Sequence, residues 1–115
     1  MIEDSRQYFP LLLNRLQQLD LFRVILFGSY ASGRPAAGSD IDLLVILDRD
    51  DYPETYREKS DLYLQVAKII RDIRQQIPID LIVQTRAMYE KFVEMDSLFA
   101  REIQEKGKVL YEADN

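Results

Sequence analysis

The sequence predicts a small two-layer domain of the α+β or α/β class, and three observations lead to this prediction. The chain has 115 residues, enough for one folded domain with a modest core. Hydrophobic residues make up 47% of it, and no apolar run approaches the length of a membrane span. Short apolar runs alternate with stretches of helical periodicity, so strands interrupted by helices are expected on one small sheet. We therefore expect residues 1–115 to form a single domain.

The first half of the chain is expected to contain two helices and two strands. Apolar residues three and four positions apart predict an amphipathic first helix, in which Pro10 marks a kink or the start; they are Phe9, Leu12, Leu13, Leu16 and Leu19. Residues 24–27 are expected to form a buried strand that ends at Gly28. A brief helix over residues 29–31 should stop before Gly33 and Pro35, and residues 41–47 should form the second strand.

The second half of the chain is expected to add helices and two more strands. Helical spacing predicts a long helix that ends before Pro78, from Leu62, Val66, Ile69, Ile70, Ile73 and Ile77. Residues 79–83 should form the third strand, followed by a helix capped by Thr85. One or two short helices are expected around residues 92–99, with Gly107 as a C-cap and residues 109–111 as a last strand.

The composition excludes several kinds of active site. The chain has no cysteine and no histidine, which rules out disulfides, zinc hydrolases, Ser-His-Asp triads, thiol nucleophiles and histidine-based nucleases. The absence of cysteine and of a signal-like N-terminus leads us to expect a cytoplasmic protein. The 20 acidic and 15 basic residues give a net charge of −5. Because nucleic-acid binding normally needs a basic surface, we expect a small molecule or a protein as co-substrate, and neither nucleic acid nor a membrane.

Three aspartates are candidates for a metal site. Asp40 and Asp42 lie two positions apart at the start of the second predicted strand, so their side chains should point to the same face. The ordinary alternative is turn chemistry and a solvated face. The apolar run around Asp42 argues against it, because a carboxylate in such a run must be paired or bound to a metal. Asp80 repeats this pattern in residues 79–83. If the two strands are neighbours, the three carboxylates form one cluster.

Such a cluster would need a cation. Three carboxylates without a basic partner would repel one another. Mg²⁺ prefers hard oxygen ligands and leaves positions for water and phosphate oxygens, and two ions would place the attacking and leaving oxygens in line. The loop spacing of an EF-hand calcium site is absent from the sequence.

Gly28 and Ser29 are candidates for a phosphate cradle. They follow a predicted strand and open a predicted helix, where free backbone N–H groups and a hydroxyl can face an anion. The dipeptide alone is weak evidence, and no P-loop motif accompanies it. Ten residues lie between Ser29 and Asp40, and this spacing gives the dipeptide value, because a phosphate cradle beside paired carboxylates suits Mg²⁺-assisted nucleotidyl transfer.

These residues resemble a known family. Gly28-Ser29, the ten-residue spacer, Asp40-Ile41-Asp42 and the later Asp80 are similar to the motif of polymerase-β-like nucleotidyltransferases. The stretch from Leu26 to Ala31 and that from Ser39 to Leu43 resemble the smallest branch. This branch comprises the minimal nucleotidyltransferases, or MNT proteins, which pair with HEPN-domain proteins in toxin–antitoxin systems. The resemblance implies the polymerase-β-like α+β fold, a small mixed sheet covered by helices.

The resemblance also implies roles for individual residues. Gly28, Ser29 and Ser39 would bind the nucleotide, and Asp40, Asp42 and Asp80 would bind two Mg²⁺ ions, with Asp80 also placed to help deprotonate the attacking hydroxyl. The expected reaction transfers AMP from ATP to a hydroxyl, expected to be a tyrosine, of a HEPN toxin. This chain would then be the antitoxin in a hetero-oligomer. Many relatives have an arginine where this chain has Ser32, and Arg34 is the candidate to replace its charge.

Two other functions stay open at this point. An antitoxin could act by occluding its toxin without catalysis, although the three intact aspartates argue against this. A nucleotidyltransferase could instead modify a small, aminoglycoside-like molecule, although such enzymes usually have additional domain mass. The apolar side chains around the terminal helices, Tyr89, Phe92, Met95, Leu98 and Phe99, are expected to pack in the core, with a docking face for a partner protein as the alternative.

Overall fold

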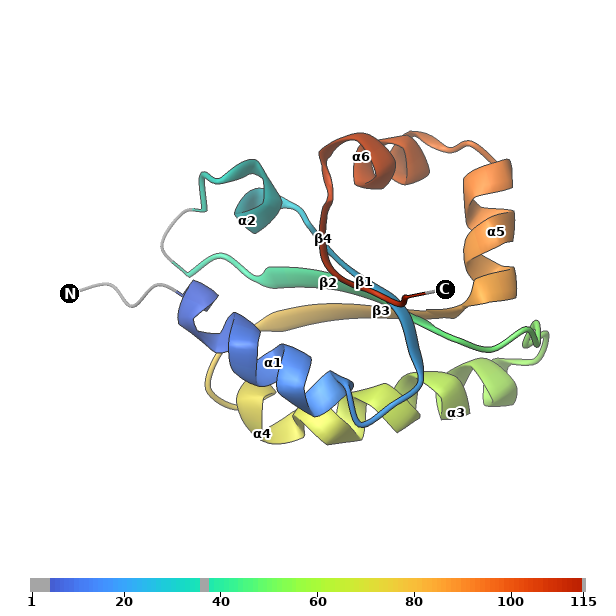
Figure 1. Ribbon diagram of the computed structural model, residues 1–115, viewed down its shortest axis with the longest axis horizontal. Helices are drawn as coiled ribbons and strands as arrows, with labels where there is room; N and C mark the ends of the chain where they lie inside the picture. The colour runs from blue at the N-terminus through green and yellow to red at the C-terminus, as the bar shows by residue number, and fades with distance from the viewer. Residues whose placement is uncertain (1–4, 36–37, 115) are drawn as a thin grey trace.

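Four strands form one mixed sheet within residues 5–35 and 38–114, the part of the chain that the computed structural model describes (Figure 1). The strands are β1 (Leu21–Phe27), β2 (Ile41–Leu47), β3 (Ile79–Thr85) and β4 (Lys108–Glu112), in the order β3-β2-β1-β4. β1 is antiparallel to β2 and to β4, whereas β2 and β3 are parallel. This arrangement confirms the α+β class and the small mixed sheet.

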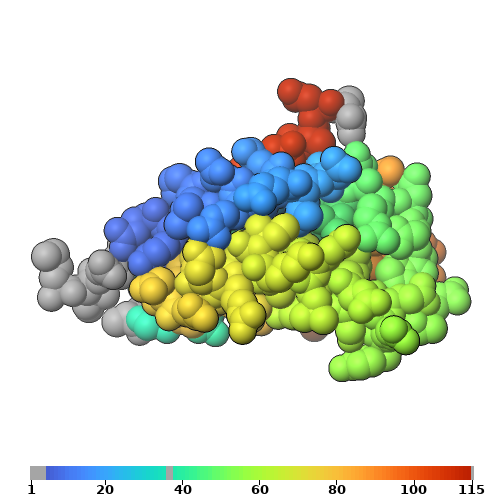
Figure 2. All heavy atoms as spheres, turned by 90° about the horizontal axis from the view of Figure 1, so that it is seen from below, coloured from blue at the N-terminus to red at the C-terminus, as the bar shows by residue number. Residues whose placement is uncertain are grey.

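Helices cover both faces of this sheet. They are η1 (Ser5–Tyr8), α1 (Phe9–Leu16), α2 (Ser29–Ser32), α3 (Tyr56–Ala67), η2 (Lys68–Ile70), α4 (Arg71–Arg74), α5 (Arg86–Glu94) and α6 (Leu98–Lys106). One face is covered by α1 and by the continuous stretch from α3 to α4, which lie side by side in Figure 2. The opposite face carries α5 and α6 (Figure 1). The expectation of only two layers is therefore wrong.

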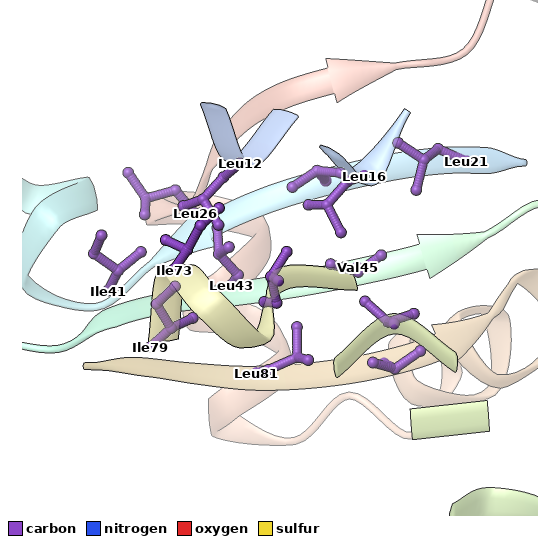
Figure 3. Close-up of a cluster of buried hydrophobic side chains, with 14 of the residues drawn as sticks. Leu12, Leu16, Leu21, Leu26, Ile41, Leu43, Val45, Ile73, Ile79 and Leu81 are labelled. Atoms are coloured by element: carbon purple, nitrogen blue, oxygen red, sulfur yellow. The ribbon is translucent and has the colours of Figure 1, made fainter. Parts of the chain in front are cut away.

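The larger hydrophobic core lies between the sheet and α1, α3 and α4. Figure 3 shows Leu12 of α1 next to Leu26 of β1, Leu16 farther along β1 toward Leu21, and Leu43 and Val45 on the neighbouring strand β2. All of these side chains are buried. Residues at alternate positions of each strand therefore point to this face, as the two-residue period of a strand requires.

A smaller core lies on the opposite face. It contains Ile25 of β1, Leu44 and Ile46 of β2 and Ile103 of α6, with aromatic side chains packed at its edge. β2 is thus buried on both faces, which explains its almost uninterrupted apolar sequence. This face is the one on which the candidate site lies.

The predicted long helix is interrupted in the structure. α3 ends at Ala67, a 3₁₀ turn (η2) follows, and α4 continues the direction of the chain. Arg15 supplies a physical reason, because its Nη1 atom donates a hydrogen bond of 3.1 Å to the carbonyl oxygen of Ile69. A donor from another element that binds a helix carbonyl competes with the i→i−4 bond and favours a tighter turn.

Other predicted boundaries differ by a few residues, and the caps agree. α1 ends at Leu16 and not near Leu19, whereas β1 begins at Leu21, three residues before the predicted start at residue 24. Thr85 caps α5 as predicted, since its Oγ1 atom accepts a hydrogen bond of 3.2 Å from the backbone N–H of Met88. Gly107 is the C-cap of α6, with extended backbone. Within the described residues no helix is both long and apolar enough to cross a bilayer.

Candidate functional site

The turn after β1 depends on Gly28. Its backbone has φ 73° and ψ −152°, a combination open almost only to glycine. The chain then enters the short helix α2, whose residues Ala31 and Ser32 both donate backbone hydrogen bonds of 3.2 Å to the Gly28 carbonyl. Gly33, with φ 77°, ends α2. The predicted strand–glycine–helix sequence is confirmed, and it leaves the N–H groups at the start of α2 without partners inside the helix.

The sheet brings two of the aspartates together. Asp42 of β2 lies opposite Phe27 in the antiparallel ladder with β1 and beside Asp80 in the parallel ladder with β3. Ile41 and Leu43 point into the larger core, so Asp42 points to the opposite face, which carries α5 and α6. Asp80 alternates with core residues in the same way and shares this face. The condition set by the sequence, that the two strands be neighbours, is met.

Gly28 and Asp42 approach closely. A Cβ atom added to Gly28 would overlap with Oδ2 of Asp42 and lie 3.0 Å from its Cγ. Any side chain at position 28 would therefore displace the Asp42 carboxylate. Glycine is required here both for its backbone conformation and for space. The turn after β1 and the beginning of β2 thus form one site.

The electrostatic environment of Asp42 opposes its negative charge. Burial raises the pKa of the Asp42 carboxyl above its ordinary value, and the charges of Asp80 and Asp40 raise it further. Asp40 and Asp80 are themselves exposed, and Asp42 is partly buried. The charges of Asp40 and Asp80 therefore act on Asp42 at this end of the sheet, and a cation would relieve this repulsion.

The carboxylates of Asp40, Asp42 and Asp80 are suitable ligands for Mg²⁺, although the three do not converge on one point. In residues 5–35 and 38–114 no three acidic side chains are close enough together to hold a metal ion. Hard carboxylate oxygens, with space kept free at Gly28, are nevertheless the ligands that Mg²⁺ prefers. The metal-binding role of Asp40, Asp42 and Asp80 stays a prediction.

The remaining predicted residues lie around this centre. Ser29 begins α2 and is partly buried, and Ser39 directly precedes Asp40. Arg34 is exposed just after α2, and its role as a replacement for the arginine of relatives stays a prediction.

The aromatic residues of the terminal helices have different environments. Tyr89 and Phe92 pack at the edge of the smaller core, as predicted, whereas Met95 and Leu98 are exposed, against the prediction. The sequence predicts Phe27 only as part of a strand. Its position opposite Asp42 and its ring contact with Phe99, at 5.5 Å between centroids, place it beside the site. The register of β1 against β2 determines that Phe27 lies beside the site, and the periodicity of the sequence alone could not predict it.

Comparisons with known sequences agree with this geometry. The family model for the nucleotidyltransferase domain matches residues 10–110. A protein of Methanocaldococcus jannaschii named "Putative protein adenylyltransferase MJ0604" is 33% identical over 90 residues, which cover 77% of each chain. The matched family region includes every residue of the candidate site.

Comparisons with solved structures show the same fold. A putative nucleotidyltransferase from Sulfolobus solfataricus aligns with a TM-score of 0.60 at 20% identity, and the alignment covers 93% of this chain and 78% of that protein. A toxin–antitoxin crystallised with AMP-PNP has a TM-score of 0.57 at 18% identity, covering 92% and 74%. A mutant of the MntA-HpeT toxin–antitoxin has a TM-score of 0.55 at 17% identity, with the same coverage.

Proposed function

The chain belongs to the nucleotidyltransferase-domain family, and from this premise we propose that it transfers AMP from ATP to a hydroxyl group of a partner protein. The observation that carries the proposal is the contact of the Gly28 turn with Asp42, which lies beside Asp80. The proposed phosphate-binding turn at Gly28 thus lies directly beside the proposed metal ligand Asp42. The proposed site residues are Gly28, Ser29 and Ser39 for the nucleotide and Asp40, Asp42 and Asp80 for the metal.

The turn at Gly28 would receive the triphosphate. Its backbone is free of a side chain, and the N–H groups at the start of α2 together with the Ser29 hydroxyl can donate to phosphate oxygens. The three aspartates would hold Mg²⁺, which when bound offsets the charge of the triphosphate. The raised pKa of Asp42 supports this role, because a site whose carboxylates oppose one another's charge gains most from a cation.

In the proposed reaction the acceptor oxygen attacks the α-phosphorus of ATP. The bond from the α-phosphorus to the bridging oxygen breaks, and pyrophosphate leaves with that electron pair. Asp80 is exposed beside Asp42 and would accept the proton of the acceptor hydroxyl. The products are an AMP ester of the acceptor and pyrophosphate.

A protein acceptor is favoured by two findings. The relative that is 33% identical bears the name of a protein adenylyltransferase, and two structures of the same fold are toxin–antitoxin complexes. Together with the resemblance to MNT proteins, they support a HEPN-domain toxin as acceptor, modified on a tyrosine, and this chain as its antitoxin in a hetero-oligomer.

The proposal is tested by intact-mass spectrometry of a purified HEPN-domain partner after incubation with this chain, ATP and Mg²⁺. We expect the partner's mass to increase by one or more AMP units, with one pyrophosphate released for each. α,β-Methylene ATP is the matched control, because its α–β bridge cannot be cleaved and the mass should not change. An aminoglycoside in place of the partner should release no pyrophosphate. A partner of unchanged mass under these conditions would contradict the proposal.

A further inference from the structure

An apolar surface is exposed where α5 meets α6. Met95, Leu98 and Phe99 keep 70%, 84% and 41% of their surface accessible. Exposed apolar side chains that lie together, unlike those scattered singly, are typical of surfaces that bind another molecule. We call residues 95–99 the α5–α6 corner.

The corner is continuous with the candidate site. The ring of Phe99 meets the ring of Phe27 edge to face, with 5.5 Å between centroids, and meets Phe92 at 5.9 Å. Phe27 in turn lies opposite Asp42 in the β1–β2 ladder. A single side chain thus separates the exposed apolar surface from the carboxylates. A molecule that covers the corner would also reach the place where transfer is proposed to occur.

The corner is built to hold its shape. Asp96 has φ 53°, and no other residue except glycine has a positive φ in the described part of the chain. Arg101 holds it with two hydrogen bonds of 2.8 and 2.6 Å to its carboxylate, and Ser97 Oγ accepts a 3.0 Å hydrogen bond from the N–H of Ala100. Aspartate tolerates positive φ at the end of a helix. These hydrogen bonds fix the turn between α5 and α6, where Met95 and Leu98 are exposed.

We propose that the α5–α6 corner is the docking surface for the acceptor protein of the transfer reaction, a proposal that rests on the proposed function. The occupant presents an apolar segment flanked by lysine or arginine. Charge supports this choice, because the exposed charged side chains next to the corner that form no ion pair within residues 5–35 and 38–114 are Glu94, Glu102 and Lys91, with a net charge of −1, and the chain as a whole carries −5. A second copy of the chain would set the same acidic residues against each other in a twofold contact.

The first test separates docking from chemistry. In Met95→Ser/Leu98→Ser we expect the KM for a HEPN-domain acceptor to rise at least about tenfold, with kcat and the KM for ATP within about twofold of wild type. Leu64→Ser is the matched control. Leu64 is 56% exposed on α3, which covers the other face of the sheet, and its replacement should leave all three constants unchanged. An acceptor KM unchanged in the double variant would overturn the proposal.

A second measurement distinguishes a failure of docking at the corner from a failure of the proposed AMP transfer. The affinity of the same HEPN-domain protein is measured by titration calorimetry without ATP. Loss of at least about tenfold in the double variant, with wild-type affinity in Leu64→Ser, supports docking at the corner even if no AMP is transferred, in which case only the proposed function fails. Wild-type affinity in the double variant, no binding by the wild-type chain, or a homodimer that the double variant abolishes would each overturn docking.

The charge of the occupant is tested separately. Glu94→Lys/Glu102→Lys should slow association with the HEPN-domain protein at low salt by about tenfold, and the difference should shrink at high salt. Faster association of this variant would show an acidic occupant and would overturn the stated chemistry.

Discussion

Asp42 combines a structural disadvantage with a proposed chemical role. It lies in a strand whose apolar neighbours are buried, and burial together with Asp80 and Asp40 raises its pKa. An ionised Asp42 therefore opposes folding at pH 7, because the folded chain holds that proton more tightly than the unfolded chain. A residue that reduces stability at a site of proposed catalysis fits the frequent conflict between stability and activity.

Asp42→Asn separates the two effects, since it removes the charge and preserves the size. Without divalent ions we expect its melting temperature at pH 7 to exceed that of wild type. Mg²⁺ should raise the melting temperature of wild type and leave that of the variant nearly unchanged. Transfer should fall by more than about 100-fold, because loss of even an outer-shell partner of a metal costs 10–100-fold. Differential scanning calorimetry and pyrophosphate release provide the measurements, and wild-type turnover of the variant with Mg²⁺ would refute the metal assignment.

Gly28 and Gly33 offer a matched pair at the residue scale. Both have positive φ, but only at Gly28 would an added Cβ meet another group, the Asp42 carboxylate. Alanine at either position should reduce the free energy of unfolding by about 1–3 kcal/mol through backbone strain. Only Gly28→Ala should also abolish ATP binding and transfer. Urea unfolding and titration calorimetry distinguish the cases, and full ATP affinity in Gly28→Ala would show that the turn does not hold the nucleotide.

At the scale of elements, the sequence predicts what depends on local pattern. The two-residue period of β2 and β3 predicts that Asp42 and Asp80 each point away from their apolar neighbours. The parallel pairing of the two strands, which the sequence pattern did not establish, places both on one face. The break between α3 and α4 could not be predicted, since it follows a hydrogen bond from Arg15, 54 residues earlier in the chain. The exposure of Leu98 could not be predicted for a similar reason, because helical spacing does not show which residues of α6 the rest of the chain covers.

The ion pair between α1 and α4 provides a prediction at the same scale. Arg15 donates two hydrogen bonds to Asp72, of 2.6 and 2.8 Å, and lowers the pKa of Asp72 from its ordinary 3.8 to about 2. A carboxyl whose pKa is lower in the folded chain stabilises the fold above pH 3.8 and loses this effect as the pH falls toward 2. Arg15→Met should therefore be less stable than wild type at pH 6, and the difference should shrink between pH 4 and pH 2.

Urea midpoints measured by circular dichroism across this pH range test the prediction. Asp61→Asn is the control, because Asp61 is an exposed acid on α3 that forms no ion pair in the described part of the chain. Its difference from wild type should not follow the same pH course. A constant difference between Arg15→Met and wild type from pH 6 to pH 2 would show that the ion pair does not hold α1 against α4.

At the scale of the whole molecule, charge and topology point to the same kind of partner. A chain with net charge −5 is poorly suited to a nucleic-acid strand, whereas a small nucleotide can bind beside a metal ion that offsets the local negative charge. The sheet places Asp42 and Asp80 on the face that α5 and α6 cover, so the proposed acceptor would approach beside these helices. The sequence could predict the acidic composition and the paired aspartates. It could not predict the direction of approach, which follows from the order of the strands.

The last prediction distinguishes a catalytic antitoxin from one that acts by occlusion. A phosphodiester formed on a HEPN-domain partner is covalent, so inhibition of the partner should persist after this chain is removed by affinity chromatography. Asp40→Asn/Asp42→Asn should still bind the partner with affinity within about threefold of wild type, because docking is proposed at the α5–α6 corner and not at the aspartates. This variant should leave the partner's mass unchanged, and inhibition should reverse on its removal. If the wild-type chain with ATP and Mg²⁺ inhibits the partner without changing its mass, occlusion is the mechanism and the aspartates serve another purpose.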